Sequence, residues 1–317
     1  MKLIIQIPCY NEAETLTETL KHLPKHINGV DAIETLIIDD GSLDATSEVA
    51  RNNGVTHVIR LTKRKGLATV FHTGLDACLK RGADIIVNTD ADGQYKGEDI
   101  PRLVQPILEN KADIVIGNRD IEQVKQFSFI KKRLQRLGSW VVRQLAGSTI
   151  ADATTGFRAY NKEAALRLNI ISEYTYTLES IIQAEHKNLA IANITIQTNR
   201  VDRPSRLFKN IPEYIKRSIV TIIRVYAMFN PFRMFLTLGT IFLTLGVIIA
   251  SRFLFYYFMG NGSGKIQSLI FAATFLIIGF QLLVVGLVSD LISANRKLIE
   301  ETLLRVKKIE LKARNNN

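Results

Sequence analysis

Two carboxylates separated by a single residue, Asp90 and Asp92, are the most chemically suggestive feature of this 317-residue sequence. They follow a short apolar run, residues 85–87, which predicts a buried strand. In an open α/β sheet, ligands bind at the carboxyl ends of the strands. Carboxylates this close repel one another unless a cation lies between them, and a hard divalent cation that also bridges substrate phosphates is the usual solution. The pattern therefore predicts a metal-held nucleoside-diphosphate substrate.

Apolar runs that predict strands alternate with helical patterns along the first part of the chain. The expected strands span residues 3–7, 33–39, 56–60, 84–88, 112–117 and 190–198, with a turn and strand over 155–160. The expected helices span residues 44–53, 66–81, 98–110 and 178–187. Another helix is expected to open at Asn11, with Glu14 completing a capping box, after Pro8 stops the first strand. This alternation is typical of βαβ units, so we predict an α/β fold with a doubly wound, Rossmann-like, mostly parallel sheet.

Polar residues also follow three other expected strands. The first strand ends in residues 8–12, the second ends in residues 39–42, and the third is followed by the basic run 63–65 and then Gly66. Gly66 opens an expected helix, whose N-terminal N–H groups can attract a phosphate. Because the carboxyl ends of parallel strands meet at one edge of a sheet, we expect these loops to lie beside the two carboxylates.

The last third of the chain holds two long apolar runs, residues 234–259 and 266–291. Each exceeds the roughly 20 residues that cross a bilayer core of about 30 Å. Two consecutive runs of this length are rare in a soluble domain, although a buried helix pair is the alternative. We therefore expect a two-helix membrane hairpin. It would be preceded by an amphipathic segment over residues 211–229 in the membrane interface and followed by a charged helical tail over residues 295–314.

The formal net charge of +11 suggests an anionic partner. The basic excess clusters beside the two apolar runs, so a membrane surface and phosphorylated substrates explain it better than a nucleic acid does. The positive-inside rule then predicts that the large domain and both termini are cytosolic. Residues 125–145 predict a basic amphipathic helix, which presents either a solvated face or a face near anionic lipid or phosphate.

The short apolar run 3–5 is too brief for a secretory signal, which also favours a cytosolic first domain. Two cysteines, Cys9 and Cys78, offer no disulfide framework, and we expect buried thiols in a reducing compartment. The five histidines are scattered without metal-ligand spacing, so we expect them to be structural or exposed.

Several short motifs follow one another along the chain. They are Pro8-x-Tyr10-Asn11-Glu12, Asp39-Asp40-Gly41-Ser42-x-Asp44-x-Thr46, Lys65-Gly66-Leu67-Ala68, Asp90-Ala91-Asp92-x-Gln94, Gly117-x-Arg119, Asp152-x-x-Thr155-Gly156-Phe157-Arg158, Glu179 and Arg200-x-x-Arg203-x-Ser205. Over residues 1–210 this set resembles the family 2 inverting glycosyltransferases of the GT-A fold, and within them the dolichyl- and polyprenyl-phosphate sugar synthases. The two apolar runs are similar to those of the membrane-anchored bacterial and archaeal branch, which implies the plasma membrane of a prokaryote.

The resemblance implies which residues bind the nucleoside-diphosphate sugar: Pro8, Tyr10, Asn11, Glu12, Ile38, Asp40, Gly41, Ser42, Lys65, Gly66, Asp90, Ala91 and Gln94. Pro8, Tyr10 and Glu12 would frame the nucleoside, and Asp40 would accept hydrogen bonds from the base. Asp90, Asp92 and Gln94 would hold Mg²⁺ or Mn²⁺ as the cofactor against the diphosphate. Family members that use GDP-mannose or UDP-glucose often carry a proline soon after the Asp-x-Asp motif. Residues 95–99 lack one, which leaves the sugar open.

The resemblance also implies a polyprenyl phosphate as the acceptor. Such a phosphate monoester is largely anionic at neutral pH and needs cations rather than a strong base. The expected acceptor-phosphate residues are Arg119, Arg158, Arg200, Arg203 and Lys209, and the expected catalytic residues are Asp92, Arg119, Asp152 and Arg158. Two roles stay open: Asp152 orients the acceptor or an arginine, and Glu179 pairs with Arg158 or binds a sugar hydroxyl.

These expectations combine into one hypothesis. Residues 1–208 form a GT-A glycosyltransferase domain, 209–232 an amphipathic juxtamembrane segment, 233–292 two transmembrane helices and 293–317 a basic cytosolic helical tail. The enzyme transfers a hexosyl or N-acetylhexosaminyl group, with inversion, from a UDP- or GDP-linked donor to an undecaprenyl- or dolichyl-type phosphate at the cytosolic face of the bilayer. The alternatives are a glycosyltransferase of the same fold that acts on another lipid or glycan, and a non-catalytic membrane scaffold. A homo-oligomer also stays open.

Overall fold

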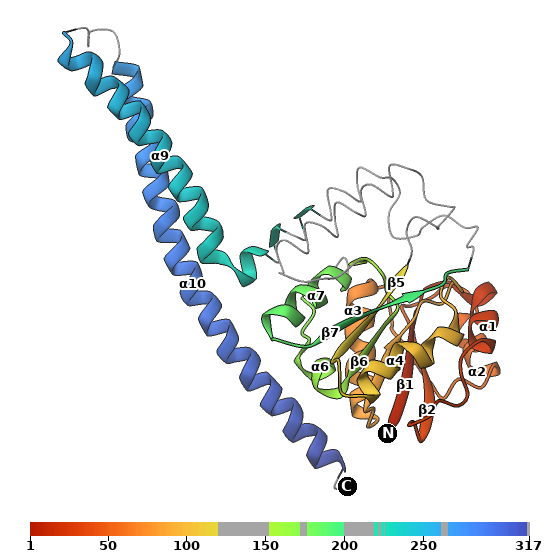
Figure 1. Ribbon diagram of the computed structural model, residues 1–317. Helices are drawn as coiled ribbons and strands as arrows, with labels where there is room; N and C mark the ends of the chain where they lie inside the picture. Colours follow the sequence, from red (N-terminus) through yellow and green to blue (C-terminus); the bar gives the residue numbers. More distant parts are fainter. Residues whose placement is uncertain are drawn as a thin grey trace. The chain divides into compact units, whose positions relative to one another are not determined.

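The computed structural model of the chain describes residues 1–119, 152–171, 176–199, 219–220, 223–224, 226–260 and 266–315 (Figure 1). Two compact units are present: Met1–Ile222 together with Leu304–Asn317 form the first, and Ile223–Leu303 form the second. The basic helix expected over residues 125–145 lies outside the described residues, as does most of the interfacial segment expected over residues 211–229.

The first unit is built on a seven-stranded sheet. In chain order its strands are β1 Lys2–Cys9, β2 Ala32–Asp39, β3 His57–Arg60, β4 Ile85–Asn88, β5 Ile114–Arg119, β6 Arg158–Asn161 and β7 Ile191–Ile196. Their spatial order is β3-β2-β1-β4-β6-β5-β7. β6 runs antiparallel to its neighbours β4 and β5, whereas the other paired strands are parallel. The predicted α/β fold with a doubly wound, mostly parallel sheet is confirmed.

Helices cover both faces of this sheet. They are α1 Ala13–Lys21, α2 Thr46–Asn52, α3 Leu67–Lys80, α4 Ile100–Leu108, α6 Lys162–Arg167 and α7 Thr177–His186, with a 3₁₀ turn, η1, at Gly97–Asp99. On one face, Leu3 of β1 shares an apolar core with Leu16 of α1 and Leu103 of α4. On the other face, α3 lies so close that a Cβ on Gly74 would be 2.8 Å from Ile38 Cδ1 of β2. Because both faces are covered, β1 is apolar along most of its length instead of alternating.

β1 continues through Pro8, although the proline was expected to stop the strand. The Gln6 carbonyl accepts a hydrogen bond from the Thr89 N–H, so Gln6 faces β4. Pro8, two residues further along, faces the same side, but the β1–β4 pairing ends at Gln6 and Asn88. The missing N–H of Pro8 therefore costs no ladder hydrogen bond, and the residue stays paired with Ile38 of β2.

The expected capping box at Asn11 and Glu14 is wrong. Helix α1 begins at Ala13 with Glu12 at its N-cap, and Glu12 makes no side-chain cap hydrogen bond. Asn11 has a φ of 55°, a left-handed conformation outside the helix. The free N–H groups at the start of the helix are instead capped by two residues that follow β2. Glu12 N donates to Oγ1 of Thr46, the first residue of α2, at 2.9 Å, and Ala13 N donates to a carboxylate oxygen of Asp44, in the loop before α2, at 3.1 Å.

The second unit is a helical hairpin made of α9, Pro231–Phe258, and the first part of α10, Ile266–Asn315. Glycines line the contact between the two helices. A Cβ on Gly239 would lie 3.0 Å from the Gly279 carbonyl oxygen, and a Cβ on Gly279 would lie 3.0 Å from the Gly239 carbonyl oxygen. Further along α9, a Cβ on Gly246 would lie 2.8 Å from Leu276 Cγ. Small residues at these positions let the two backbones approach closely.

Both helices are long and apolar enough to cross a membrane, as predicted. Their most apolar windows are only 11% and 17% buried inside the structure. A core helix of a soluble protein would be mostly buried, so this exposure favours the predicted membrane hairpin over a buried helix pair.

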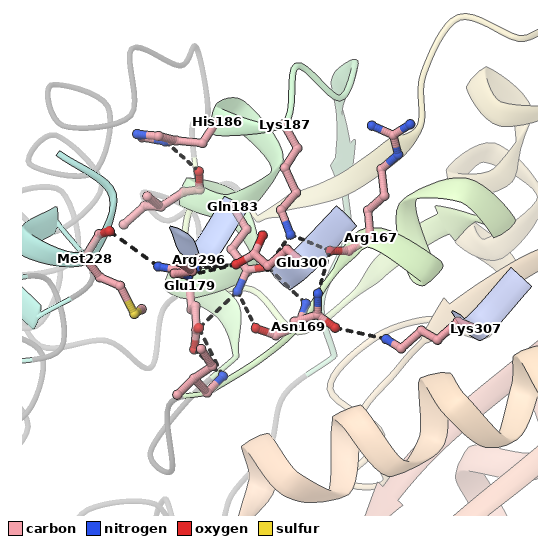
Figure 2. A network of polar contacts seen from close by, with 12 residues as sticks. Arg167, Asn169, Glu179, Gln183, His186, Lys187, Met228, Arg296, Glu300 and Lys307 are labelled. Carbon is pink, nitrogen blue, oxygen red and sulfur yellow. Dashed lines mark hydrogen bonds and ion pairs between the residues drawn. The ribbon is translucent and has the colours of Figure 1, made fainter. Parts of the chain in front are cut away.

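Helix α10 continues without a break through the tail expected over residues 295–314, because residues 287–315 contain neither Gly nor Pro. Its last turns belong to the first unit. There Leu304 is buried, and Lys308 forms an ion pair with Glu163 of α6 at 2.9 Å. Lys307 donates a hydrogen bond to Asn169 Oδ1 at 2.9 Å (Figure 2). The end of α10 is therefore packed on α6 and the residues after it.

Candidate active site

The Asp-x-Asp loop begins at the carboxyl end of β4, whose side chains are buried. Asp92 Oδ1 accepts a hydrogen bond from the Gln94 N–H at 3.1 Å, and the Thr19 hydroxyl donates to the Ala91 carbonyl at 2.9 Å. The loop is thus held by its own turn and by α1, and the side chains of Asp90 and Asp92 are half-buried at its surface.

Asp40 and Gly41, at the end of β2, hold the loop between β3 and α3. The Asp40 carboxylate accepts hydrogen bonds from the backbone N–H groups of Lys65 at 2.6 Å and Gly66 at 3.0 Å. Gly41 has a φ of 68°, and a Cβ there would lie 2.9 Å from the backbone carbonyl carbon of Lys63. Both oxygens of Asp40 therefore accept hydrogen bonds from the protein backbone, and the expected contact of Asp40 with a nucleobase stays a prediction.

The same end of β2 also holds the loop between β1 and α1. Asn11 N donates to Ser42 Oγ at 2.9 Å, and Leu43 N donates to Asn11 Oδ1 at 2.8 Å. Ser42 N in turn donates to Asp39 Oδ1 at 2.8 Å. Together with the caps on α1 described above, these hydrogen bonds tie the loops after β1, β2 and β3 to one another.

Carboxylates from several loops gather around the end of β1, where the Cys9 thiol is buried. Burial, followed by the negative charges of Glu12, Asp39, Asp44 and Asp90, raises the pKa of the Cys9 thiol well above its ordinary value. The strand-end loops therefore meet at one edge, as the parallel topology predicted. Such a thiol stays protonated at neutral pH, and the expectation of a buried Cys9 is confirmed.

Helix α3 presents its N-terminus at this edge. Gly66 is its N-cap with a φ of 90° and has no side chain of its own to cap the helix, and the first turn contains no acidic residue. The Asp40 carboxylate binds the Gly66 N–H, and the N–H groups of the first turn follow it. Unpaired N–H groups at a helix N-terminus attract anions such as phosphate. In the basic run before it, the Arg64 guanidinium lies 4.3 Å from the centre of the Tyr10 ring. Arg64 was not among the expected site residues, although the basic run over 63–65 is a signal that points to it.

Arg119, at the end of β5, forms a bidentate ion pair with Asp152. Its Nε donates to Asp152 Oδ2 at 2.7 Å, and its Nη2 donates to Asp152 Oδ1 at 3.2 Å and to Thr154 Oγ1 at 2.8 Å. Burial would raise the pKa of Asp152, but the Arg119 charge and the hydrogen bonds outweigh it and hold that pKa below its usual value. The geometry favours the second of the two roles left open for Asp152, that of orienting an arginine.

Arg158 and Ile38 lie inside the first unit. Arg158 is 1% exposed, and its guanidinium donates to the carbonyl oxygens of Ala153, Thr155 and Thr177 at 2.9–3.0 Å. These bonds join the loop before β6 to α7, so the placement does not support the expected role of Arg158 in binding the acceptor phosphate. Ile38 packs against α3 rather than facing the loops, which likewise does not support a direct nucleotide contact.

Glu179 of α7 is also fully buried. Its Oε1 accepts hydrogen bonds from Ile171 N and Gln183 Nε2, both at 3.0 Å (Figure 2). These contacts join α7 to the segment that follows α6, which favours a structural role over sugar binding. Arg200, Arg203 and Lys209 lie outside the described residues, so their expected contacts stay predictions.

The side-chain oxygens at this edge suit a hard cation whose remaining coordination positions are filled by a substrate. Asp90 and Asp92 could supply carboxylates and Gln94 an amide oxygen, which are the ligand types that Mg²⁺ and Mn²⁺ prefer. In the part of the chain that the structure describes, no three His, Cys, Asp or Glu side chains form a cage for a metal. Mg²⁺ is typically bound through one or two carboxylates together with substrate phosphates. The residues therefore fit a metal that is shared with a diphosphate.

Comparison with known proteins identifies the family. Residues 4–168 match the sequence profile of glycosyl transferase family 2. This chain belongs to that family. The glycosyltransferase is 33% identical over 184 residues to the undecaprenyl-phosphate mannosyltransferase of Micrococcus luteus, across 56% of this chain and 74% of the relative. It is 31% identical over 217 residues to the UDP-N-acetylglucosamine–dolichyl-phosphate N-acetylglucosaminyltransferase of Methanococcus voltae, across 61% of this chain and 83% of the relative.

A solved structure confirms the fold of the glycosyltransferase. The glucosyl-3-phosphoglycerate synthase of Mycobacterium tuberculosis, in complex with Mn²⁺, UDP and glucosyl-3-phosphoglycerate, matches with a TM-score of 0.55 at 19% identity. The match covers 71% of this chain and 78% of that one. At this identity the likeness shows the fold alone, and the predicted GT-A architecture is confirmed.

Proposed function

We propose that this glycosyltransferase transfers a hexosyl or N-acetylhexosaminyl group from a UDP- or GDP-linked donor to a polyprenyl phosphate, with inversion. The observation that carries the proposal is the meeting of the Asp-x-Asp loop and the α3 N-terminus at one sheet edge. The two long apolar helices in the same chain account for a lipid acceptor. The relatives named for undecaprenyl- and dolichyl-phosphate transfer support this acceptor class.

The donor would lie along the edge formed by the loops after β1, β2, β3 and β4. Pro8, Tyr10 and Glu12 frame the nucleoside, and Asp40 holds Lys65 and Gly66 so that the N-terminus of α3 faces the diphosphate. Asp90, Asp92 and Gln94 hold Mg²⁺ or Mn²⁺. When bound, that cation acts as a Lewis acid that stabilises the charge on the leaving diphosphate.

The acceptor needs positive charge rather than a strong base. A phosphate monoester has a second pKa of about 6, so at neutral pH one of its oxygens attacks the anomeric carbon directly while the bond to the diphosphate breaks. One displacement of this kind inverts the anomeric configuration. Arg119 supplies a cation that Asp152 holds in place, and we propose Arg200, Arg203 and Lys209 as further ligands of the acceptor phosphate.

The basic flanks of the hairpin set the proposed topology. We propose a catalytic domain over residues 1–208, an amphipathic juxtamembrane segment over 209–232, two transmembrane helices over 233–292 and a cytosolic tail over 293–317. By the positive-inside rule, the catalytic domain and both termini lie in the cytosol of a prokaryote, and transfer takes place at the cytosolic face of the plasma membrane.

The test is transfer by the full-length protein in detergent or lipid nanodiscs. Radiolabelled UDP-glucose, UDP-N-acetylglucosamine and GDP-mannose are each incubated with Mg²⁺ or Mn²⁺ and undecaprenyl phosphate. We expect organic-extractable label with at least one donor, no label after chelation, and no label with Asp92→Asn, whose circular dichroism and melting temperature should match those of the wild type. A folded wild-type protein that labels no lipid with any donor would overturn the proposal, and NMR of the product's anomeric proton tests inversion.

A further inference from the structure

The loop that carries Asp90 and Asp92 is fastened at both of its ends to one residue, Gly156. Asn88, just before the loop, donates from Nδ2 to the Gly156 carbonyl at 2.8 Å. Tyr95, just after the loop, accepts at its hydroxyl oxygen from the Gly156 N–H at 3.2 Å. A single glycine in the turn before β6 therefore holds both the start of the loop, at Asn88, and its end, at Tyr95.

The missing side chain of Gly156 leaves the space that the Asp90 carboxylate occupies. A Cβ at this position would lie 3.0 Å from Asp90 Oδ1, 3.3 Å from Asp90 Oδ2 and 2.9 Å from the Tyr176 hydroxyl oxygen. Real Cβ atoms almost never sit this close to so many neighbours, so an alanine would displace the carboxylate, the tyrosine or the turn.

Buried groups on both sides keep Gly156 in place. The Tyr176 hydroxyl donates to the Gly156 carbonyl at 3.3 Å and accepts from Asn88 Nδ2 at 2.8 Å. The Tyr176 ring is stacked on Phe71 of α3, with 3.7 Å between the ring centres and an interplanar angle of 4°. The Tyr95 ring is stacked on Phe157 at 5.1 Å and 12°. The four rings and Asn88 are all buried, so tight packing rather than a ligand holds this arrangement.

We infer that Gly156 is a positioning residue for Asp90, with Tyr95 and Tyr176 as its supports. It sets the place of a carboxylate that the proposed function assigns to the metal, and the inference rests on that assignment. Substituting a residue that orients a metal ligand typically weakens metal binding by about 10- to 100-fold. The turn before β6 thus influences the metal affinity of a site that lies on the loop after β4.

The test measures Mn²⁺ binding by electron paramagnetic resonance, with full-length protein in detergent and with or without UDP. We expect Gly156→Ala to weaken Mn²⁺ binding by about 10- to 100-fold. Tyr95→Phe keeps the ring stack and removes the hydroxyl, so we expect a loss of about 10-fold with little change in melting temperature. Ile107→Ala is the matched control, because Ile107 is a core residue near the C-terminus of α4. It should lower the melting temperature and leave Mn²⁺ affinity unchanged.

Asp90→Asn separates this inference from the proposed function. Wild-type Mn²⁺ affinity in Asp90→Asn would show that Asp90 is not a metal ligand. That result would overturn both the positioning role of Gly156 and the assignment of Asp90 to the metal in the proposed function. Weak binding in Asp90→Asn, combined with wild-type binding in Gly156→Ala and Tyr95→Phe, would overturn the positioning role and leave the metal assignment standing. If Gly156→Ala does not fold, Tyr95→Phe decides between the two. Equal losses in Tyr95→Phe and in Ile107→Ala would also count against a specific role.

Discussion

Arg119 and Asp152 form a bidentate ion pair inside the first unit, with 2.7 Å between Arg119 Nε and Asp152 Oδ2. Their side chains are 7% and 0% exposed, so neither charge is well solvated. A buried charge is tolerated when its partner remains and is costly when its partner is removed. This ion pair therefore links the stability of the glycosyltransferase to the position of the Arg119 guanidinium at its candidate active site.

Asp152→Ala should lower the free energy of unfolding by about 3–5 kcal/mol, because it leaves the Arg119 charge buried without its carboxylate. Chemical denaturation of the full-length protein in detergent measures this loss. The double variant Arg119→Met with Asp152→Leu removes both charges, so it should recover much of the stability but none of the transfer activity. An Asp152→Ala protein as stable as the wild type would contradict the structure of this pair.

The stabilising effect of Asp152 should also depend on pH. The folded protein holds the pKa of Asp152 below the unfolded value of about 3.9, so its contribution is complete above that value and is lost as the pH falls through the folded-state pKa. We expect the stability difference between wild type and Asp152→Asn to be constant from about pH 8 to pH 5 and to shrink below about pH 4. A difference that instead disappears as the pH rises towards 8 would have the wrong sign.

Asp40→Ala should raise the KM for the donor, because it releases the Lys65 and Gly66 backbone and lets the N-terminus of α3 move. Hydrogen bonds to a charged group contribute about 1.5–3 kcal/mol, which corresponds to a tenfold or greater rise in KM. Steady-state kinetics with the donor and the acceptor varied separately checks this. Glu48→Ala, an exposed acidic residue of α2, is the control and should leave both KM values unchanged.

Arg203→Ala should raise the KM for the polyprenyl phosphate by about tenfold and change the donor KM less, because a charge-assisted contact to the acceptor is lost. Arg203→Lys keeps the charge but lacks the planar guanidinium, so its KM for the polyprenyl phosphate should lie between those of the wild type and Arg203→Ala. The measurement is transfer rate against acceptor concentration at saturating donor. A larger effect on the donor KM would move Arg203 to the donor side of the site.

Much of the sheet was predictable from the sequence, because its strands carry a strong local signal. Residues 85–87, for example, form an apolar run between a turn and a polar loop, and both faces of β4 are covered in the structure. The two apolar helices carry an even stronger signal, since each run is longer than a soluble core needs. The meeting of the strand-end loops then followed from parallel topology alone.

The roles of individual polar residues were harder to predict, because they depend on contacts between distant segments. Arg158 looked like a phosphate ligand, but carbonyl groups of Ala153, Thr155 and Thr177 surround its guanidinium. Asn11 looked like a helix cap, but Asp44 and Thr46, which follow β2, cap α1 instead. The spacing of residues along one segment does not reveal such partners.

The hydrogen bonds among the loops after β1, β2 and β3 also bear on attempts to re-engineer donor preference. Asn11, Ser42 and Asp40 connect each of these loops to the next, so the three behave as one piece. Grafting a single loop from a relative that uses another nucleotide sugar would break the bonds at its borders and distort the neighbours it was meant to complement. A chimaera should therefore exchange all three loops together, and the boundaries that suit such an exchange lie within the strands themselves.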